Sequence, residues 1–381
     1  MSKPCCKKPS RRAVLGALAG AAGAPALLGS SGFLASPAQA QRSELPLWAA
    51  GQRNGILFGA SSSWEVIRDP GYRDLHATHS RLLVTDKAMK FDYLRPREDV
   101  MNFEEADALL AFAREHGMWF RGHTLFWNDY PPPWLKGKSS VEIERIFEDH
   151  IERVGGRYAG AMHSWDVVNE PFWPGSGAPG GFRRGPWFDA MGEAYIFRAF
   201  QRMARIDSTA KLVLNEAFTE QDDALGKGVR ARMIPLIDRM LDRGIKLDAI
   251  GLQAHIKPGL AFDIEAFLRF IEDIGARKLR IYLSEFDVDD DSFPRETAKR
   301  DELVAQWTTR FLQPVLKNPA IDALITWHLS DKYTWYREPA VVAQRKRDFP
   351  ARPLPFDEWF QGKPMAEAMR SALLAAGPRR S

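Results

Sequence analysis

The chain has 381 residues and a net charge of +4, and both of its cysteines, Cys5 and Cys6, lie close to the start. Residues 1–40 carry five cations and no acidic side chain, so removing them leaves residues 41–381 with a net charge of −1. This charge balance excludes the excess of basic residues that is typical of a nucleic-acid-binding protein. The cysteine positions leave residues 41–381 without a disulfide, a thiolate nucleophile or a cysteine metal site.

The first forty residues have the three parts of a cleavable export signal. A basic stretch that includes Arg11-Arg12 is followed by an Ala/Gly-rich run over residues 13–35, and Ala38-Gln39-Ala40 supplies the small residues of a cleavage site. The arginine pair indicates twin-arginine export of a folded protein. A membrane anchor is the alternative, but Pro25 and the many glycines make a poor spanning helix. We therefore expect a periplasmic or secreted protein with no membrane association after cleavage.

Short apolar runs alternate with amphipathic stretches along residues 41–381, and neither a linker nor a repeat interrupts them. Such alternation is typical of parallel strands that are joined by helices. The expected strands are Ile56–Ser61, Leu82–Thr85, Trp119–Thr124, Ser164–Asn169, Lys211–Asn215, Ala249–Gln253, Arg280–Ser284 and Ala323–Trp327. The expected helices are Phe103–His116, Val141–Tyr158, Phe188–Ile206, Arg230–Arg243, Asp263–Gly275 and Glu296–Leu316.

Eight strands alternating with helices favour an α/β fold, a (β/α)8 TIM barrel formed as a single domain by residues 41–381. A doubly wound open sheet is the alternative, but the turn Gly59-Ala60-Ser61-Ser62-Ser63 does not match a phosphate-binding glycine loop. Gly117, Gly244 and Gly275 each follow a helical stretch, where glycine commonly ends a helix.

Polar side chains gather where the expected strands end. In a barrel of this kind the carboxyl ends of all strands meet on one face, and active sites are built there. One polar strand end means little, because Asn and Asp are common in turns. Six strands end this way, with His123, Asn169-Glu170, Asn215-Glu216, Gln253 and His255, Glu285 and Asp287, and Trp327.

Two of these strand ends supply glutamates. Glu170 closes the run Trp165–Glu170 before Pro171, and Glu285 is followed two residues later by Asp287. Two carboxyls facing each other across a cleft are what glycoside hydrolysis requires. One must hold a proton for the leaving oxygen, and the other must stay ionised to attack or stabilise the anomeric carbon. Taken alone, either glutamate could simply form a salt bridge or cap a helix. The pair, at the ends of two strands, indicates a glycosidase.

Several motifs together resemble the retaining endo-β-1,4-xylanases of glycoside hydrolase family ten. They follow one another in the family's order between about residues 56 and 370. They are Arg121–Trp127, Trp165–Pro171, Gly251–His255, Ser284–Asp287, Thr326–Asp331 with Trp335, Phe356-Asp357 and Lys363-Pro364.

The resemblance implies a role for each matched residue. Glu170 matches the general acid/base, Glu285 the nucleophile, and Asn169 the amide that binds the 2-hydroxyl of the sugar at the cleavage point. His255 matches an imidazole that touches the nucleophile, and Asp287 the acid that orients it. The implied substrate-binding residues are the polar groups Lys90, His123 and Gln253, the aromatic walls Trp127, Trp327 and Trp335, and the distal-sugar positions Asp86 and Lys87.

Four positions depart from the family pattern. Asp86 stands for a glutamate, Lys87 for an asparagine that binds the distal sugar, Tyr130 for a glutamine and His328 for a glycine. These changes concern the glycone side of the cleft and not the two glutamates. One hypothesis is that Lys87, together with Arg183 and Arg184, favours an acidic xylan. The alternative is that these three cations are ordinary loop charges.

The expected activity is endo-hydrolysis of β-1,4-xylan with retention of configuration, for which the carboxyls should lie about 5–5.5 Å apart. A related barrel glycosidase acting on β-glucan or mannan is the first alternative. A sugar-binding protein without activity is the second, although the presence of both glutamates argues against it. We expect a monomer that needs no cofactor and no metal, since none of the usual metal or phosphate motifs occurs in residues 41–381.

Overall fold

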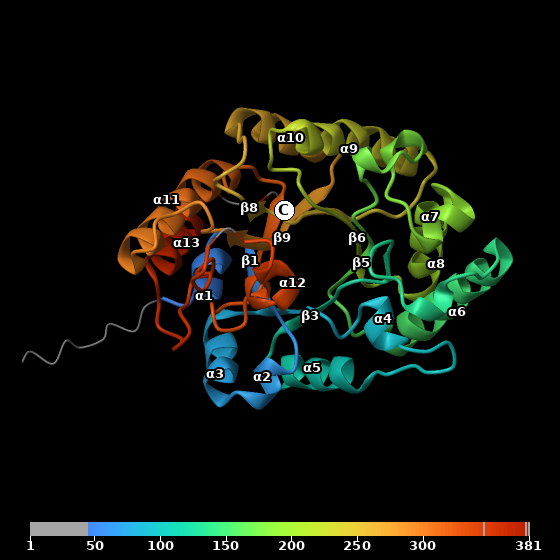
Figure 1. Cartoon of the computed structure of the whole chain (residues 1–381), viewed down its shortest axis with the longest axis horizontal. Helices are drawn as coiled ribbons and strands as arrows, with labels where there is room; N and C mark the ends of the chain where they lie inside the picture. Colours follow the sequence, from blue (N-terminus) through green and yellow to red (C-terminus); the bar gives the residue numbers. More distant parts are fainter. Residues whose placement is uncertain (1–44, 346, 378, 380–381) are drawn as a thin grey trace, which may run out of the picture. The chain divides into compact units, whose positions relative to one another are not determined.

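Eight parallel strands form a closed ring at the centre of the domain (Figure 1). The structure is a computed structural model that describes residues 45–345, 347–377 and 379, so the expected export signal lies outside the described residues. The ring runs in the order β10-β1-β2-β3-β5-β6-β7-β9, and β9 pairs with β10 to close it. The strands are β1 (Leu57–Ser62), β2 (Leu82–Thr85), β3 (Trp119–Gly122), β4 (Phe126–Trp127), β5 (Ser164–Asn169), β6 (Lys211–Glu216), β7 (Ala249–Leu252), β8 (His255–Ile256), β9 (Arg280–Val288) and β10 (Ile321–Thr326).

Helices surround the ring on its outer side and cover the strands from solvent (Figure 1). None of those in the described part of the chain is long and apolar enough to cross a bilayer. The α-helices are α1 (Leu47–Gln52), α2 (Glu65–Arg68), α3 (Pro70–His79), α4 (Phe91–Leu94), α5 (Glu104–Glu115), α6 (Ser140–Tyr158), α7 (Pro186–Met191), α8 (Ala194–Ile206), α9 (Ala224–Asp242), α10 (Ile264–Ala276), α11 (Thr297–Val315), α12 (Pro339–Val342) and α13 (Pro364–Ala375). The 3₁₀ turns are η1 (Pro133–Leu135), η2 (Pro174–Ser176), η3 (Pro179–Gly181) and η4 (Trp335–Arg337).

The interior of the barrel is packed with alternate residues of the strands. Leu82 and Val84 of β2, and Ala323 and Ile325 of β10, belong to one buried apolar cluster inside the ring. Successive strand side chains point to opposite faces, so residues two apart share the interior while their neighbours pack on the helices. The expected (β/α)8 barrel is confirmed, and its packed interior confines chemistry to the strand ends.

Some predicted boundaries were wrong. The third strand ends at Gly122, because Leu125 instead donates its N–H to the carbonyl of Asp166 on β5, 3.0 Å away. The seventh predicted strand continues to Val288, because β8 adds a further pair of residues beside it. The helix predicted over 188–206 is two helices separated by Gly192, which has φ 59°.

The helix-ending glycines were also only partly right. Gly117 and Gly244 lie in the left-handed region with φ 62° and 64°, as a C-terminal helix stop requires. Gly275 lies inside α10, and Lys278 takes the left-handed position with φ 63°. The helix therefore continues past the glycine that was expected to end it.

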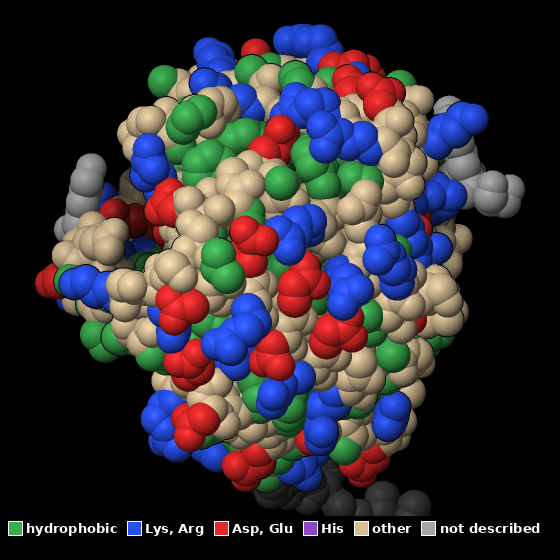
Figure 2. Space-filling view, turned by 90° about the vertical axis from the view of Figure 1, so that its right-hand side faces the viewer, with side chains coloured by type: hydrophobic (Ala, Val, Ile, Leu, Met, Phe, Trp, Pro, Cys, Tyr) green, Lys and Arg blue, Asp and Glu red, His purple; other side chains and the backbone are tan. Residues whose placement is uncertain are grey.

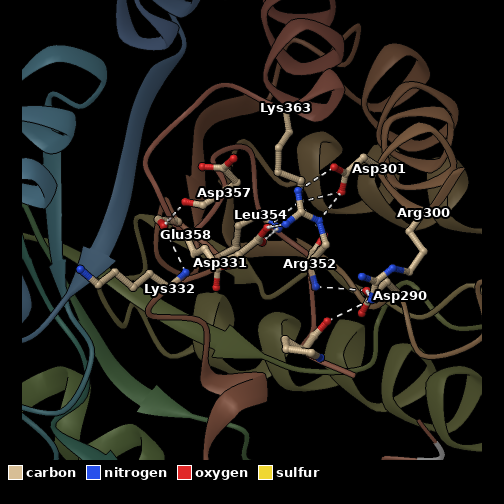
Figure 3. Close-up of polar contacts among 12 residues, drawn as sticks. Asp290, Arg300, Asp301, Asp331, Lys332, Arg352, Leu354, Asp357, Glu358 and Lys363 are labelled. Atoms are coloured by element: carbon tan, nitrogen blue, oxygen red, sulfur yellow. Dashed lines mark hydrogen bonds and ion pairs between the residues drawn. The ribbon is translucent and has the colours of Figure 1, made fainter. Parts of the chain in front are cut away.

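Four cations and four carboxylates form a mostly buried network that fixes the segment after β10, residues 327–363. Figure 3 shows the part of it around Arg352 and Asp331. Lys363 Nζ lies 2.8 Å from Asp331 Oδ2, and Arg352 binds Asp301 through two bonds of 2.8 and 2.7 Å. Burial raises the pKa of Asp331 to about 6 in spite of the Lys363 ammonium. The network consists of Arg300, Arg345, Arg352 and Lys363 with Asp289, Asp290, Asp301 and Asp331.

The surface around α6, α7 and α8 carries acidic and basic side chains that alternate over the face (Figure 2). Arg198 of α8 pairs with Glu144 and Glu148 of α6 at 2.8 and 3.0 Å. The side chains of these pairs are 33–40% exposed, so solvent screens them and they contribute little to stability. The buried network in Figure 3 is different, because a charge left there without its partner cannot be hydrated.

Lys363→Met should lower the free energy of unfolding by about 3 kcal/mol, because it removes the cation that is hydrogen-bonded to the buried Asp331 carboxylate and leaves only Arg352, 3.9 Å away. Guanidinium chloride unfolding would measure the loss. Lys299→Met is the matched control, since Lys299 pairs with Glu302 on the exposed face of α11 and should leave stability nearly unchanged. Equal unfolding midpoints for the two variants would contradict the assigned role of the network.

Candidate active site

The predicted site residues gather at the carboxyl end of the barrel. Asn169 is the last residue of β5, and Glu170 follows it with φ 48°. Left-handed backbone at a residue with a side chain costs free energy, and such strain is concentrated at functional sites. The Glu170 N–H donates to the carbonyl of Asn215 on β6 at 2.8 Å, and this bond holds the unusual turn.

Glu285, in β9, is buried and hydrogen-bonded through both of its carboxylate oxygens. Asn215 Nδ2 donates to Oε1 at 2.8 Å, and His255 Nε2 lies 3.3 Å from Oε2. Burial alone would raise the pKa of Glu285, but the His255 hydrogen bond and the charges of His123 and His255 bring the pKa below its usual value. Glu285 is therefore ionised at neutral pH.

His255 is held as a cation between two carboxylates. Its Nδ1 lies 2.9 Å from Asp287 Oδ2, and its Nε2 faces Glu285. Burial opposes the charge, but the two carboxylates outweigh it and raise the pKa of His255 to about 10. Trp335 Nε1 also donates to Asp287 Oδ2 at 2.9 Å, so this tryptophan fixes the orienting acid as well as packing on the His255 ring.

Glu170 accepts hydrogen bonds from side chains of three other segments. Gln253 Nε2 donates to Oε1 at 2.8 Å, and Trp127 Nε1 donates to Oε2 at 3.2 Å. The guanidinium of Arg183 also donates to Oε2, at 2.8 Å. The sequence suggested Arg183 only as a cation for acidic xylan or as an ordinary loop charge, because it lies 13 residues after Glu170 and no periodic pattern relates the two.

Asn215 connects the two halves of the site. Besides Glu285, its Nδ2 donates to Asn169 Oδ1 at 2.8 Å, and its Oδ1 accepts from Ser284. A Cβ added at Gly251 would lie 2.1 Å from this Oδ1, so only glycine leaves room for the amide. The sequence singled out Asn215 as a polar strand end but gave it no role, since its partners belong to β5 and β9.

His123 and Trp327 line the floor of the same site. His123 Nδ1 lies 2.9 Å from Asp166 Oδ2, and Asp166 also pairs with the fully buried Arg121. The ring of Trp327 stands edge-on to His123 at 5.1 Å between centroids. Trp165 packs wholly in the core instead, where a Cβ at Gly122 would lie 2.2 Å from its ring.

Lys90 and Asp86 form the side of the site next to β2. The Lys90 ammonium lies 3.6 Å from Asp86 Oδ1 and within 6 Å of the ring centres of Trp127 and Trp327. Burial would raise the pKa of Asp86, but Lys90 and His328 lower it well below its usual value. A narrow pocket beside Lys90 and Trp127 is also lined by Tyr130, whose ring contacts that of Trp127 at 5.2 Å.

His328 explains how the shorter Asp86 is held. Its Nε2 lies 3.2 Å from Asp86 Oδ2 and its Nδ1 lies 3.2 Å from the hydroxyl of Tyr72. The Tyr72 oxygen accepts from the Leu329 N–H, so its own proton fits a donation to Nδ1 of a neutral His328. His328 has φ 69°, a conformation that glycine adopts more easily, and these contacts outweigh that strain.

The three cations considered for acidic xylan already have partners within the chain. Lys87 Nζ lies 2.6 Å from Glu338 Oε1, and this bridge joins the end of β2 to the segment after β10. Arg184 pairs with Asp189 at 3.1 Å, and Arg183 with Asp129 and Glu170. Pairing removes much of the field with which these cations would attract an acidic branch. In the described part of the chain, His, Cys, Asp and Glu form no group that could hold a metal ion.

The barrel carries two glutamates at its strand ends, and their hydrogen-bond partners differ. This combination of fold and site is typical of a glycoside hydrolase. Residues 47–372 match the family described as glycosyl hydrolase family 10, and the chain belongs to this family. It is 30% identical to a β-1,4-xylanase of Dictyoglomus thermophilum over 80% of this chain and 86% of that one. It is 28% identical to endo-1,4-β-xylanase B of Thermotoga neapolitana over 87% and 92% of the two chains.

The solved structures agree with the sequence relatives. Xylanase 10B from Thermotoga petrophila RKU-1, in complex with xylobiose, superposes with a TM-score of 0.75 at 27% identity. The superposition covers 86% of this chain and 97% of that one. The resemblance inferred from the motifs is therefore confirmed at the level of family and fold.

The imidazolium of His255 should make stability depend on pH. Its pKa is raised in the folded protein, so its contribution is fully present below pH 6.5 and is lost as the pH rises toward 10. Melting temperatures measured from pH 6.5 to 10 should fall more steeply for the wild type than for His255→Gln. Parallel slopes would show that His255 is not held as a cation.

His328→Gly should weaken substrate binding although it relieves backbone strain. Losing the hydrogen bond to Asp86 frees that carboxylate and the Lys90 ammonium, which should raise KM for xylo-oligosaccharides about tenfold, with a smaller change in kcat. Lys278→Gly is the matched control, because it relieves the same left-handed strain at an exposed position between α10 and the start of β9. Unchanged KM in His328→Gly would remove this residue from the binding side of the cleft.

Proposed function

We propose that this family 10 hydrolase is an endo-acting, retaining β-1,4-xylanase with Glu170 as general acid/base and Glu285 as nucleophile. The observation that carries the proposal is the buried carboxylate of Glu285, which a cationic His255 braced by Asp287 keeps ionised. The names of the D. thermophilum and T. neapolitana relatives, both xylanases, support the choice of polymer.

In the first step Glu285 attacks the anomeric carbon of the sugar at the cleavage point. The bond between that carbon and the glycosidic oxygen breaks, and Glu170 gives its proton to the departing oxygen. The new bond is an ester between the sugar and Glu285. Asn169, which accepts a hydrogen bond from the amide of Asn215, would bind the neighbouring 2-hydroxyl, a contact that strengthens in the transition state.

In the second step Glu170 acts as a base. It takes a proton from a water molecule, the water oxygen bonds to the anomeric carbon, and the ester to Glu285 breaks. The configuration is inverted twice and so retained. For this geometry the two carboxyl groups should lie about 5–5.5 Å apart, whereas an inverting enzyme needs roughly 6.5–9.5 Å.

The remaining polar and aromatic residues would bind the polymer. Lys90, His123 and Gln253 offer hydrogen bonds to hydroxyl groups, and Trp127, Trp327 and Trp335 offer flat faces on which sugar rings pack. The same surfaces suit β-glucan or mannan, so the choice of xylan depends on the relatives. Initial rates on xylan, carboxymethyl cellulose and mannan separate these polymers.

We further propose that residues 1–40 direct export and are then removed, which leaves residues 41–381 as the mature enzyme in the periplasm or outside the cell. The support is the basic stretch with Arg11-Arg12, the apolar run and the small residues at its end. Xylan is too large to enter a cell, and this agrees with an exported enzyme.

Replacing each glutamate should remove a different part of the reaction. Glu170→Gln should lower kcat on xylohexaose by roughly 10²–10⁴-fold, because proton transfer to the leaving oxygen is lost. In Glu170→Gln the rate of the first step should fall much less with 2,4-dinitrophenyl xylobioside, because its leaving group needs no proton. Glu285→Gln should abolish turnover of both substrates, because no ester can form.

Glu302→Gln is the matched control, since Glu302 lies on the exposed face of α11. Proton NMR of the first product should show the β-anomer before mutarotation, as retention requires. Hydrolysis by Glu170→Gln or Glu285→Gln at the wild-type rate would contradict the assigned roles. A first product in the α-configuration would contradict the two-step mechanism.

A further inference from the structure

The segment after β5 folds back so that Arg183 reaches the expected acid/base. Phe172 and Phe182 form an antiparallel bridge and their rings stack at 4.9 Å. Next to this bridge the Arg183 N–H donates to the carbonyl of Pro171 at 2.7 Å. The hairpin therefore fixes the Arg183 backbone beside Glu170, with little freedom in where the side chain begins.

The guanidinium of Arg183 is shared between two carboxylates. Its Nη2 donates to Glu170 Oε2 at 2.8 Å, its Nε donates to the Glu170 carbonyl at 3.0 Å, and its Nη1 pairs with Asp129. The side chain is only 9% exposed, and the Trp173 ring covers it at 4.8 Å. A cation enclosed in this way strongly stabilises the ionised form of a carboxylate in contact with it.

The other side chains around the Glu170 carboxyl are mostly neutral. Trp127, Gln253 and Asn169 supply donors without charge. The buried Glu216 also faces Glu170, and burial, followed by the Glu170 charge, raises the pKa of Glu216 well above its usual range. Burial likewise raises the pKa of Asp129, which Arg183 opposes. Among the described contacts, Arg183, Glu216 and Asp129 are the charged or titratable groups that interact with Glu170.

We propose that Arg183 and Asp129 are positioning residues that set the balance between the acid and base forms of Glu170. The proposal rests on the proposed function of Glu170. A retaining enzyme needs this carboxyl protonated in the first step and ionised in the second. Arg183 favours the ionised form that accepts the proton of water, while Asp129 neutralises Arg183 when Glu170 carries its proton.

Two substitutions at this pair should move the pH dependence in opposite directions. Arg183→Gln removes the cation, so Glu170 keeps its proton to higher pH and the alkaline limb of kcat/KM on xylohexaose moves up by about one pH unit. Asp129→Asn leaves the whole charge of Arg183 on Glu170 and moves the same limb down. Arg183→Lys keeps the charge but cannot make the three guanidinium contacts, so its alkaline limb should move less than that of Arg183→Gln.

The second step gives an independent readout. With 2,4-dinitrophenyl xylobioside the first step needs no acid, so kcat reports how well Glu170 acts as a base. Arg183→Gln should lower this kcat about tenfold, and added azide should restore it, because azide attacks the ester without losing a proton. Arg198→Gln is the control, since Arg198 pairs only with Glu144 and Glu148 on the outer helices in the contacts described above.

The outcomes separate this inference from the proposed function. If Glu170→Gln is inactive on xylohexaose while both pair variants keep the wild-type alkaline limb, Arg183 and Asp129 have only a structural role and the inference fails. Alkaline limbs that move in the same direction in both variants would also overturn it. The proposed charge effect requires opposite shifts, whereas a general loss of packing would affect both variants alike. Full activity of Glu170→Gln would instead overturn the proposed function itself.

Discussion

The contact between the His255 imidazolium and the Glu285 carboxylate is the constraint on which the rest of the site depends. Glu285 is buried and the side chain of His255 is only 15% exposed, and a charge removed from water is stable only with a partner. Asp287 supplies the second negative charge that keeps His255 protonated, and Trp335 fixes Asp287. The chain of contacts thus runs from the barrel strand β9 to the segment after β10.

The closed barrel makes this arrangement possible because it brings strand ends together that are remote in sequence. Asn215 shows the effect most directly, since one amide from β6 contacts Asn169 of β5 and Glu285 of β9. Gly251 of the next strand leaves the space that this amide occupies. The interior of the barrel is filled with apolar side chains and the buried Arg121–Asp166 ion pair, so it acts as a rigid base for these contacts and not as a channel.

At the periphery of the site, charged residues pair with residues from another segment of the chain. At the β2 side, Asp86 and Lys87 each pair with a residue from the segment after β10, namely His328 and Glu338. The buried ion pair of Lys363 and Asp331 anchors the same segment (Figure 3). The two positions Asp86 and His328, which both depart from the family pattern, therefore contact one another at the edge of the site and not at the two glutamates.

The sequence by itself determined the barrel, the two glutamates and most of their neighbours, because strand periodicity and short motifs are local properties. It could not place the pairings of Arg183 with Glu170, Lys87 with Glu338 or His328 with Asp86, since a charged or polar residue in a loop looks the same whether solvated or paired. It also misjudged where β3 and α10 end, because hydrogen bonds from other segments and a left-handed Lys278 decide those boundaries. Only the tertiary structure decides which distant charges meet, since burial and distance set the strength of each pair.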